Sequence, residues 1–100
     1  MYYYHATSEK AFNSILCDGQ IKPGFDGLIY LAESKEDAYK FIAFRLFGEP
    51  IIILELTIPD NKLLEETFDH SYAFFKCKAF GYPESINFSY VNNVYKYEPN

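Results

Sequence analysis

The segment IIILELTI, residues 51–58, constrains the fold of this chain more than any other stretch. Isoleucine fills its first three positions, and β-branched side chains favour extended backbone. The rest alternates between apolar and polar side chains, in the order Leu54, Glu55, Leu56, Thr57 and Ile58. An alternation with a period of two predicts a strand, and this is the strongest strand signal in the chain.

Two helices are predicted before this strand. Ser8 or Thr7 can cap the first, and Gly19 stands where a left-handed C-cap belongs. The apolar face of this helix is expected to contain Ala11, Phe12, Ile15 and Leu16. Ser34 can cap the second helix, and Gly48 is expected to close it. One face of the second helix is expected to contain Ala38, Phe41, Ile42 and Arg45.

Further strands are predicted at residues 2–5, 28–32, 73–80 and 86–97, the last of which has room for two. Lys76 and Lys78 are expected on the open face of the third. Residues 60–66 are expected to form a short turn of helix, and QIKPGFDG and GYPES are expected to be turns. Helices early and strands late favour an α+β domain over a doubly wound parallel sheet.

The composition fits one domain, residues 1–100, with one apolar core. Of these 100 residues 49% are hydrophobic and 20% aromatic, which is too apolar for a disordered segment. The net charge is −5 and Lys and Arg do not cluster, so we expect no stable nucleic-acid binding. No leader-like segment opens the chain, and no apolar run reaches about 18 residues. We therefore expect a cytoplasmic protein without membrane association.

Metal binding and several common catalytic classes find no support in the sequence. Cys17 and Cys77 are the only cysteines, and neither belongs to a CxxC or a Cys/His cluster, so we expect no zinc site. Both thiols are expected to be reduced and packed, one on a helix and one in a strand. The chain also contains no GxGxxG, P-loop, HExxH or GxSxG motif.

Four residues are candidates for a functional site, and each has a structural alternative. His5 ends the first predicted strand beside a helix start, whose free N–H groups favour anions, but a histidine there can equally bond a nearby carbonyl. Tyr30 can pack in the core or stack on a planar ligand. His70 in FDHSY and Glu84 in YPES can serve a site or lie solvated in loops. Taken singly, these residues leave both alternatives open.

Taken together, several short motifs occur in a recognisable order. A strand ending in YHAT, a helix with IL and DG, then GLIYLAES and a helix starting with EDA resemble the first half of the ADP-ribosyltransferase superfamily. That superfamily includes diphtheria-toxin-like enzymes and NAD-dependent RNA 2′-phosphotransferases, and the similarity covers residues 2–44. It implies a small split β-sandwich of about six strands, with two helices in the N-terminal half and NAD as a substrate between two sheets.

The resemblance also implies roles for individual residues. His5 would hydrogen-bond the ribose or adenosine portion of NAD, with Thr7 close by, and Tyr30 would stack on the nicotinamide ring. Nicotinamide would leave through an oxocarbenium-like ribose that a carboxylate and preorganised dipoles stabilise. His70 would be a further polar contact for the ligand.

The carboxylate is the point where the chain departs from the family pattern. The family's acid usually begins a late strand, but residues 70–80 contain no Asp or Glu. Glu84 follows this segment and Asp69 precedes it, and Glu84 is the preferred candidate. His70 or Ser71 can instead supply a different polar group, as in family members that lack the glutamate.

These features support three hypotheses about function. The first is a small mono-ADP-ribosyltransferase-like enzyme that uses NAD and modifies a protein or nucleic-acid acceptor. The second is an inert module of the same fold that binds NAD, ADP-ribose or a related nucleotide, or that inhibits a partner protein. The third is an α+β domain whose exposed aromatic side chains form a protein interface.

Overall fold

The computed structural model describes residues 2–43, 46, 48–67 and 79–99. Its elements are β1 (Tyr3–Ser8), α1 (Glu9–Asp18), β2 (Gln20–Ile21), β3 (Ile29–Leu31), α2 (Lys35–Ala43), β4 (Ile51–Leu56), η1 (Asn61–Leu63), β5 (Glu65–Thr67), β6 (Ala79–Tyr82), β7 (Ile86–Asn87), η2 (Phe88–Tyr90) and β8 (Val91–Tyr97). The elements η1 and η2 are single turns of 3-10 helix. No helix in these ranges is long and apolar enough to cross a membrane.

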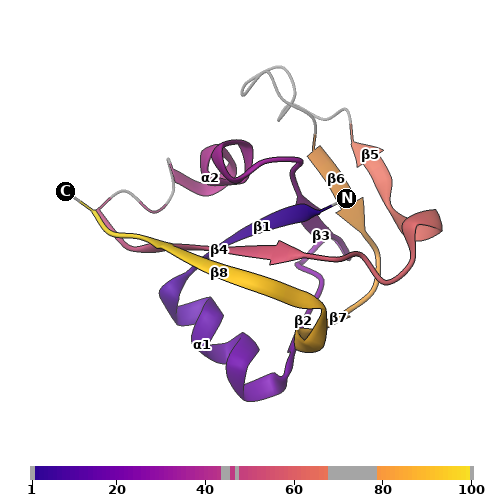
Figure 1. Cartoon of the computed structure of the whole chain (residues 1–100), viewed down its shortest axis with the longest axis horizontal. Coiled ribbons are helices and arrows are strands. Elements are labelled where there is room, and N and C mark those ends of the chain that lie inside the picture. The colour runs from indigo at the N-terminus through magenta and orange to yellow at the C-terminus, as the bar shows by residue number, and fades with distance from the viewer. Residues whose placement is uncertain (1, 44–45, 47, 68–78, 100) are drawn as a thin grey trace.

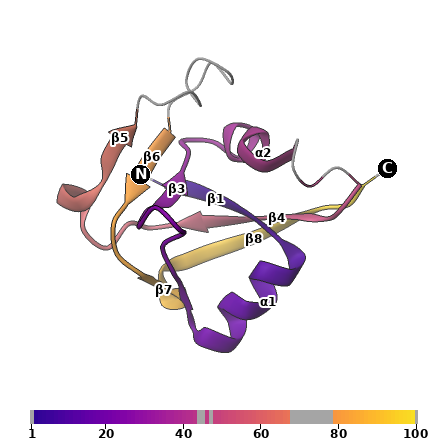
Figure 2. The same ribbon diagram turned by 180° about the vertical axis from the view of Figure 1, so that it is seen from behind.

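The strands of the described residues form three antiparallel sheets, with the orders β1-β4-β8, β3-β6-β5 and β2-β7. One bridge, between Tyr4 and Ala32, joins the first sheet to the second. Both views show α1 and α2 on opposite sides of β1-β4-β8 (Figures 1 and 2). The chain therefore has the expected α+β class, with eight strands in the described part instead of about six.

β4 is the central strand of its sheet, so all six of its residues are buried. Ile52 and Leu54 face the larger core, whereas Ile51 and Ile53 pack with side chains of α2 on the other side. Glu55 alternates onto the α2 side and is only 8% exposed. The polar residue of this strand thus lies inside the protein rather than on a solvent face.

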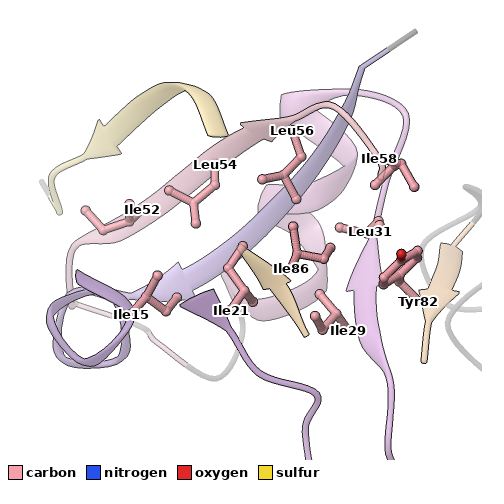
Figure 3. Packing of buried hydrophobic residues seen from close by; sticks show 10 residues of the cluster. All are labelled: Ile15, Ile21, Ile29, Leu31, Ile52, Leu54, Leu56, Ile58, Tyr82 and Ile86. Carbon is pink, nitrogen blue, oxygen red and sulfur yellow. The ribbon is translucent and has the colours of Figure 1, made fainter. Parts of the chain in front are cut away.

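The larger core lies between the sheets and α1 (Figure 3). Its buried members are Ile15, Ile21, Ile29, Leu31, Ile52, Leu54, Leu56, Ile58, Tyr82 and Ile86. All but Ile58, which follows β4, belong to α1, β2, β3, β4, β6 or β7, so these six elements share one core. Removing each such isoleucine or leucine from water contributes about 1.5–3 kcal/mol to folding.

Helix α1 begins and ends where local chemistry predicts, and α2 begins as predicted but ends at Ala43, before the expected Gly48. The Ser8 Oγ accepts a hydrogen bond from the Ala11 N–H at 3.0 Å, which confirms Ser8 as the cap of α1. Gly19 has a φ of 72° and its N–H donates to the Ile15 carbonyl at 2.8 Å, as expected for a C-cap. Ser34 caps α2, because its Oγ accepts from the backbone N–H three residues later at 3.1 Å.

Four segments differ from the predictions. β1 continues to Ser8, beyond the expected residues 2–5. Residues 20–21 form β2 inside a predicted turn, and residues 65–67 form β5 where a helical turn was predicted. GYPES is a turn only from Pro83 onward, since its first two residues belong to β6. β2 pairs with β7 and β5 pairs with β6. Such short strands form through their partners, and their own residues give little sequence signal for a strand.

The buried face of α1 is narrower than predicted. Ile15 is buried and Phe12 packs against the core, whereas Leu16 is 50% exposed. Cys17 is an exposed free thiol, so its predicted packing is wrong. Each residue turns a helix by about 100°, which carries positions 16 and 17 away from the stripe that Ile15 occupies. Four residues with predicted positions lie outside the described ranges: Arg45, Lys76, Cys77 and Lys78.

Candidate functional site

β1 and β3 are joined by a single bridge, and His5 lies directly beside it. The Tyr4 and Ala32 N–H groups each donate to the other residue's carbonyl at 2.9 Å. In a regular antiparallel ladder the next hydrogen-bonded pair would be Ala6 with Tyr30. Among the described residues no such bridge follows, and the His5 Nδ1 lies 2.9 Å from the Tyr30 carbonyl oxygen instead. We call the place where His5 and Tyr30 meet the fork.

The bond to the Tyr30 carbonyl is the structural alternative expected for His5, and it defines the tautomer of the ring. A carbonyl oxygen can only accept, so Nδ1 carries the proton and donates it to Tyr30. Burial lowers the pKa of His5, against a smaller opposing effect of this hydrogen bond, and the ring is neutral at pH 7. Nε2 is then an acceptor. The described residues form no hydrogen bond with Nε2.

Tyr30 points away from the larger core, because its neighbours Ile29 and Leu31 are the residues of β3 that point into it. Its ring is half-buried, and its hydroxyl donates to the Asp26 Oδ2. The Asp26 Oδ1 accepts from the Leu28 N–H at 3.2 Å. The hydrogen bond from Tyr30 is the main cause of a lowered pKa at Asp26, so this exposed carboxyl group is anionic at neutral pH.

Asp26 was not predicted as a site residue. The available signal was the Asp-Gly pair just before a strand, because an aspartate in such a turn accepts from the N–H two residues later. The turn is further held by the Gly24 N–H, which donates to the Leu28 carbonyl at 3.0 Å. Leu28 also covers Gly81 of β6, where any added Cβ would lie 2.9 Å from the Leu28 Cδ1. Glycine at position 81 therefore lets the turn lie against the sheet.

The other predicted site residues lie apart from this contact. Thr7 shares the His5 side of β1 but is only 8% exposed. Glu84 is exposed in the turn between β6 and β7, and within the described ranges no hydrogen bond or ion pair joins it to His5 or Tyr30. Its charge adds to the effect of burial in raising the pKa of Tyr82. His70 lies outside the described residues, as do Asp69 and Ser71.

A second polar group, which was not predicted, spans β1, β4 and β8. The buried carboxyl of Glu55 accepts from the Tyr4 hydroxyl at 3.1 Å and from the Asn93 Nδ2 at 2.6 Å. Burial and the contact with Glu55 raise the pKa of Tyr4, so its hydroxyl remains a donor. Since Tyr4 faces Glu55 and Glu55 faces Asn93 in the sheet register, these bonds cross three strands in one row. This row satisfies a buried acid and is a structural feature of the sheet.

No group of three or more His, Cys, Asp and Glu side chains that could hold a metal occurs in the described part of the chain. The neutral imidazole of His5 contacts only the main-chain carbonyl of Tyr30, whereas the Tyr30 hydroxyl is bonded to the anionic carboxylate of Asp26. Helix α1 begins at Glu9, four residues after His5.

The fold of this chain also occurs in solved structures. The chain is similar to protein CC0527 from Caulobacter crescentus, with a TM-score of 0.69, 15% sequence identity, and 96% of this chain matched to 85% of that one. A double mutant of CC0527 gives a TM-score of 0.70 with the same identity and coverage. At this identity the similarity shows a shared fold and nothing about activity. No protein-family model and no curated protein sequence matches the chain.

Proposed function

We propose that this protein binds NAD at the fork and transfers ADP-ribose from it to a macromolecular acceptor. The observation that supports this most strongly is that His5 and Tyr30 lie next to each other, with the His5 Nδ1 2.9 Å from the Tyr30 carbonyl oxygen. Two residues that the resemblance assigns to one ligand lie 25 positions apart in sequence and are in direct contact. Had the core separated them, a shared nucleotide site would be impossible.

Each group at the fork has a function in this proposal. The His5 Nε2 accepts a hydrogen bond from a ribose hydroxyl, and the Tyr30 ring stacks on nicotinamide. The start of α1 favours the pyrophosphate, because the first N–H groups of a helix carry partial positive charge. The expected reaction breaks the bond between ribose and nicotinamide through an oxocarbenium-like transition state, which negative charge stabilises.

The identity of the stabilising carboxylate separates two forms of the proposal. Glu84 is the acid that the sequence favours, and Asp26 is the carboxylate in contact with Tyr30. If neither reaches the reacting ribose, the protein is an inert module that binds NAD, ADP-ribose or a related nucleotide. The exposure of Glu84 and its lack of contact with His5, within the described ranges, favour this second candidate function.

Binding and turnover together test the proposal. Calorimetry with NAD, and transfer of label from radioactive NAD to proteins and RNA of a cell lysate, are measured for the wild type, His5→Gln and Tyr30→Ala. Both variants are expected to lose binding and transfer, whereas the control Tyr97→Ala on β8 keeps both. Thermal unfolding of each variant confirms that it folds.

Three outcomes are possible. Binding with transfer supports the enzyme. Binding that raises the melting temperature without any transfer supports the inert module, because a ligand that binds only the folded state stabilises it. No binding at millimolar NAD refutes the enzyme and an inert module for NAD.

A further inference from the structure

β8 lies at the edge of its sheet, and the direction of its backbone groups follows from the sheet register. It ends the order β1-β4-β8 and, with seven residues, is the longest strand of the described chain (Figure 1). Tyr4 exchanges hydrogen bonds with Ala32, so its N–H and carbonyl point away from β4. In an antiparallel sheet the residue opposite such a position also points its groups to its other neighbour. Opposite Tyr4 is Glu55, which therefore bonds Asn93 of β8.

The backbone groups of β8 that face outward are those of Asn92, Val94 and Lys96. Because bonded positions alternate along a strand, Asn93, Tyr95 and Tyr97 point toward β4, and the residues between them point away from it. Among the described residues no backbone hydrogen bond involves these outward groups, and all three residues are exposed. The edge thus presents a row of donors and acceptors that can pair with a further strand.

The features that usually protect an edge strand are weak on β8. Edges are commonly protected by proline, by bulges or by charged side chains, lysine above all. β8 contains no proline, and its register shift lies at its first residues. Its one charged side chain, Lys96, forms ion pairs with Glu9 at 2.6 Å and Glu98 at 3.2 Å, so its charge is balanced. At the centre of the strand, Val94 is apolar and 45% exposed.

The strand is complementary to a second copy of itself. An antiparallel pair with a two-fold axis at Val94 sets each of the seven residues of β8 against one residue of the other copy. Lys96 then faces Asn92 of the second copy, whereas an axis at Lys96 would set two lysines against each other. Asn92, Val94 and Lys96 lie at hydrogen-bonded positions of this pair, where opposite residues exchange both of their bonds.

We propose that this protein forms a two-fold dimer in which the β8 strands of two copies pair antiparallel about Val94. The result is one continuous sheet with the order β1-β4-β8-β8-β4-β1. Hydrogen bonds along a single edge bury few side chains, so the dimer is reversible and forms as the concentration rises. The inference is independent of the proposed function, because the fork lies on β1 and β3, across β4 from this edge.

Sedimentation equilibrium of the full chain measures the association, from about 10 μM to about 1 mM. The average mass is expected to rise from 11.7 kDa toward twice that value. Val94→Lys places two like charges against each other at the axis, and Val94→Pro removes the outward N–H while leaving the bonds to β4, so both variants are expected to stay monomeric. The matched control is Leu16→Lys, because Leu16 is 50% exposed on α1, and it should dimerise like the wild type. Thermal unfolding confirms that each variant folds.

Amide hydrogen exchange of the wild type tests which backbone groups form the interface. The amides of Asn92, Val94 and Lys96 are expected to exchange fast in dilute protein and to become protected in concentrated protein. Those of Asn93 and Tyr95 should be protected at both concentrations, because they bond β4. A wild type that is still monomeric at about 1 mM would refute the inference. A dimer that both Val94 variants leave intact, or one without protection of the three outward amides, would overturn it as well.

Discussion

The buried row of Tyr4, Glu55 and Asn93 provides the sharpest prediction about stability. Tyr4→Phe removes the hydroxyl that donates to the Glu55 Oε1 at 3.1 Å and changes no other contact of the ring. Glu55 is 8% exposed, so water cannot easily replace this donor. Leaving a buried acceptor unsatisfied costs about 1–3 kcal/mol. We therefore expect a loss of about 2 kcal/mol, out of a total of about 5–15 kcal/mol for a domain of this kind.

The measurement is urea unfolding followed by far-UV circular dichroism, since the chain contains no tryptophan. A loss of this size lowers Tm by about 8–16 °C in a domain of this length. The control is Tyr2→Phe, because Tyr2 is 52% exposed and has no hydrogen bond among the described residues. Combining Tyr4→Phe with Glu55→Leu should restore part of the loss, since no acceptor is then left without its donor. A Tyr4→Phe protein within about 0.5 kcal/mol of the wild type would refute this reasoning.

Three further substitutions test other parts of the structure. Burial holds the pKa of His5 in the folded protein below its value in the unfolded chain, which is about 6.5. Between the folded and the unfolded pKa only the unfolded state binds the proton. The free energy of unfolding therefore rises with pH in that range and levels off above about pH 6.5. His5→Gln should remove this dependence in unfolding curves recorded from pH 5 to pH 8. Gly81→Ala should cost about 1–2 kcal/mol of unfolding free energy, because the new Cβ would lie 2.9 Å from the Leu28 Cδ1. Combining it with Leu28→Ala removes that methyl group, so the cost of Gly81→Ala should be smaller in the double variant. Gly19→Ala should cost about 1 kcal/mol because φ is 72°, whereas Gly24→Ala, with only ordinary contacts for its Cβ, should be near neutral by the same assay.

The features that the sequence predicts correctly depend on nearby residues. Ser8, Gly19 and Ser34 act on backbone groups within four positions, so the N-caps of both helices and the C-cap of α1 follow from local chemistry. The strand at IIILELTI likewise follows from its own apolar content. These elements are recognisable before any tertiary contact is known.

The features that the sequence misses depend on distant partners. Glu55 is buried because β8 flanks it on one side and β1 on the other, and its donors come from 51 positions before and 38 after it. β2 and β5 exist only through pairing with β7 and β6. The exposure of Leu16 likewise depends on the angle at which α1 meets the core.

The candidate site also depends on contacts between distant residues that the sequence does not show. The resemblance predicts His5 and Tyr30 at one ligand, which stays a prediction, and the structure shows the His5 ring against the Tyr30 main-chain carbonyl. It does not predict Asp26, although the bond to Tyr30 spans only four residues, because the direction of the phenol depends on how the turn lies against β6. The predicted acid Glu84 has no interaction with His5 or Tyr30 among the described residues.

The most direct test of the central claim is an NMR titration of NAD into protein with ¹⁵N-labelled histidine, with His5→Gln used for assignment. The free protein is expected to show His5 as the neutral Nδ1–H tautomer, since Nδ1 donates to the Tyr30 carbonyl. NAD is then expected to shift the Nε2 signal in a saturable way, because Nε2 is the acceptor at the fork. An Nε2–H tautomer in the free protein, or an Nε2 signal that does not move at millimolar NAD, would contradict a nucleotide site at His5.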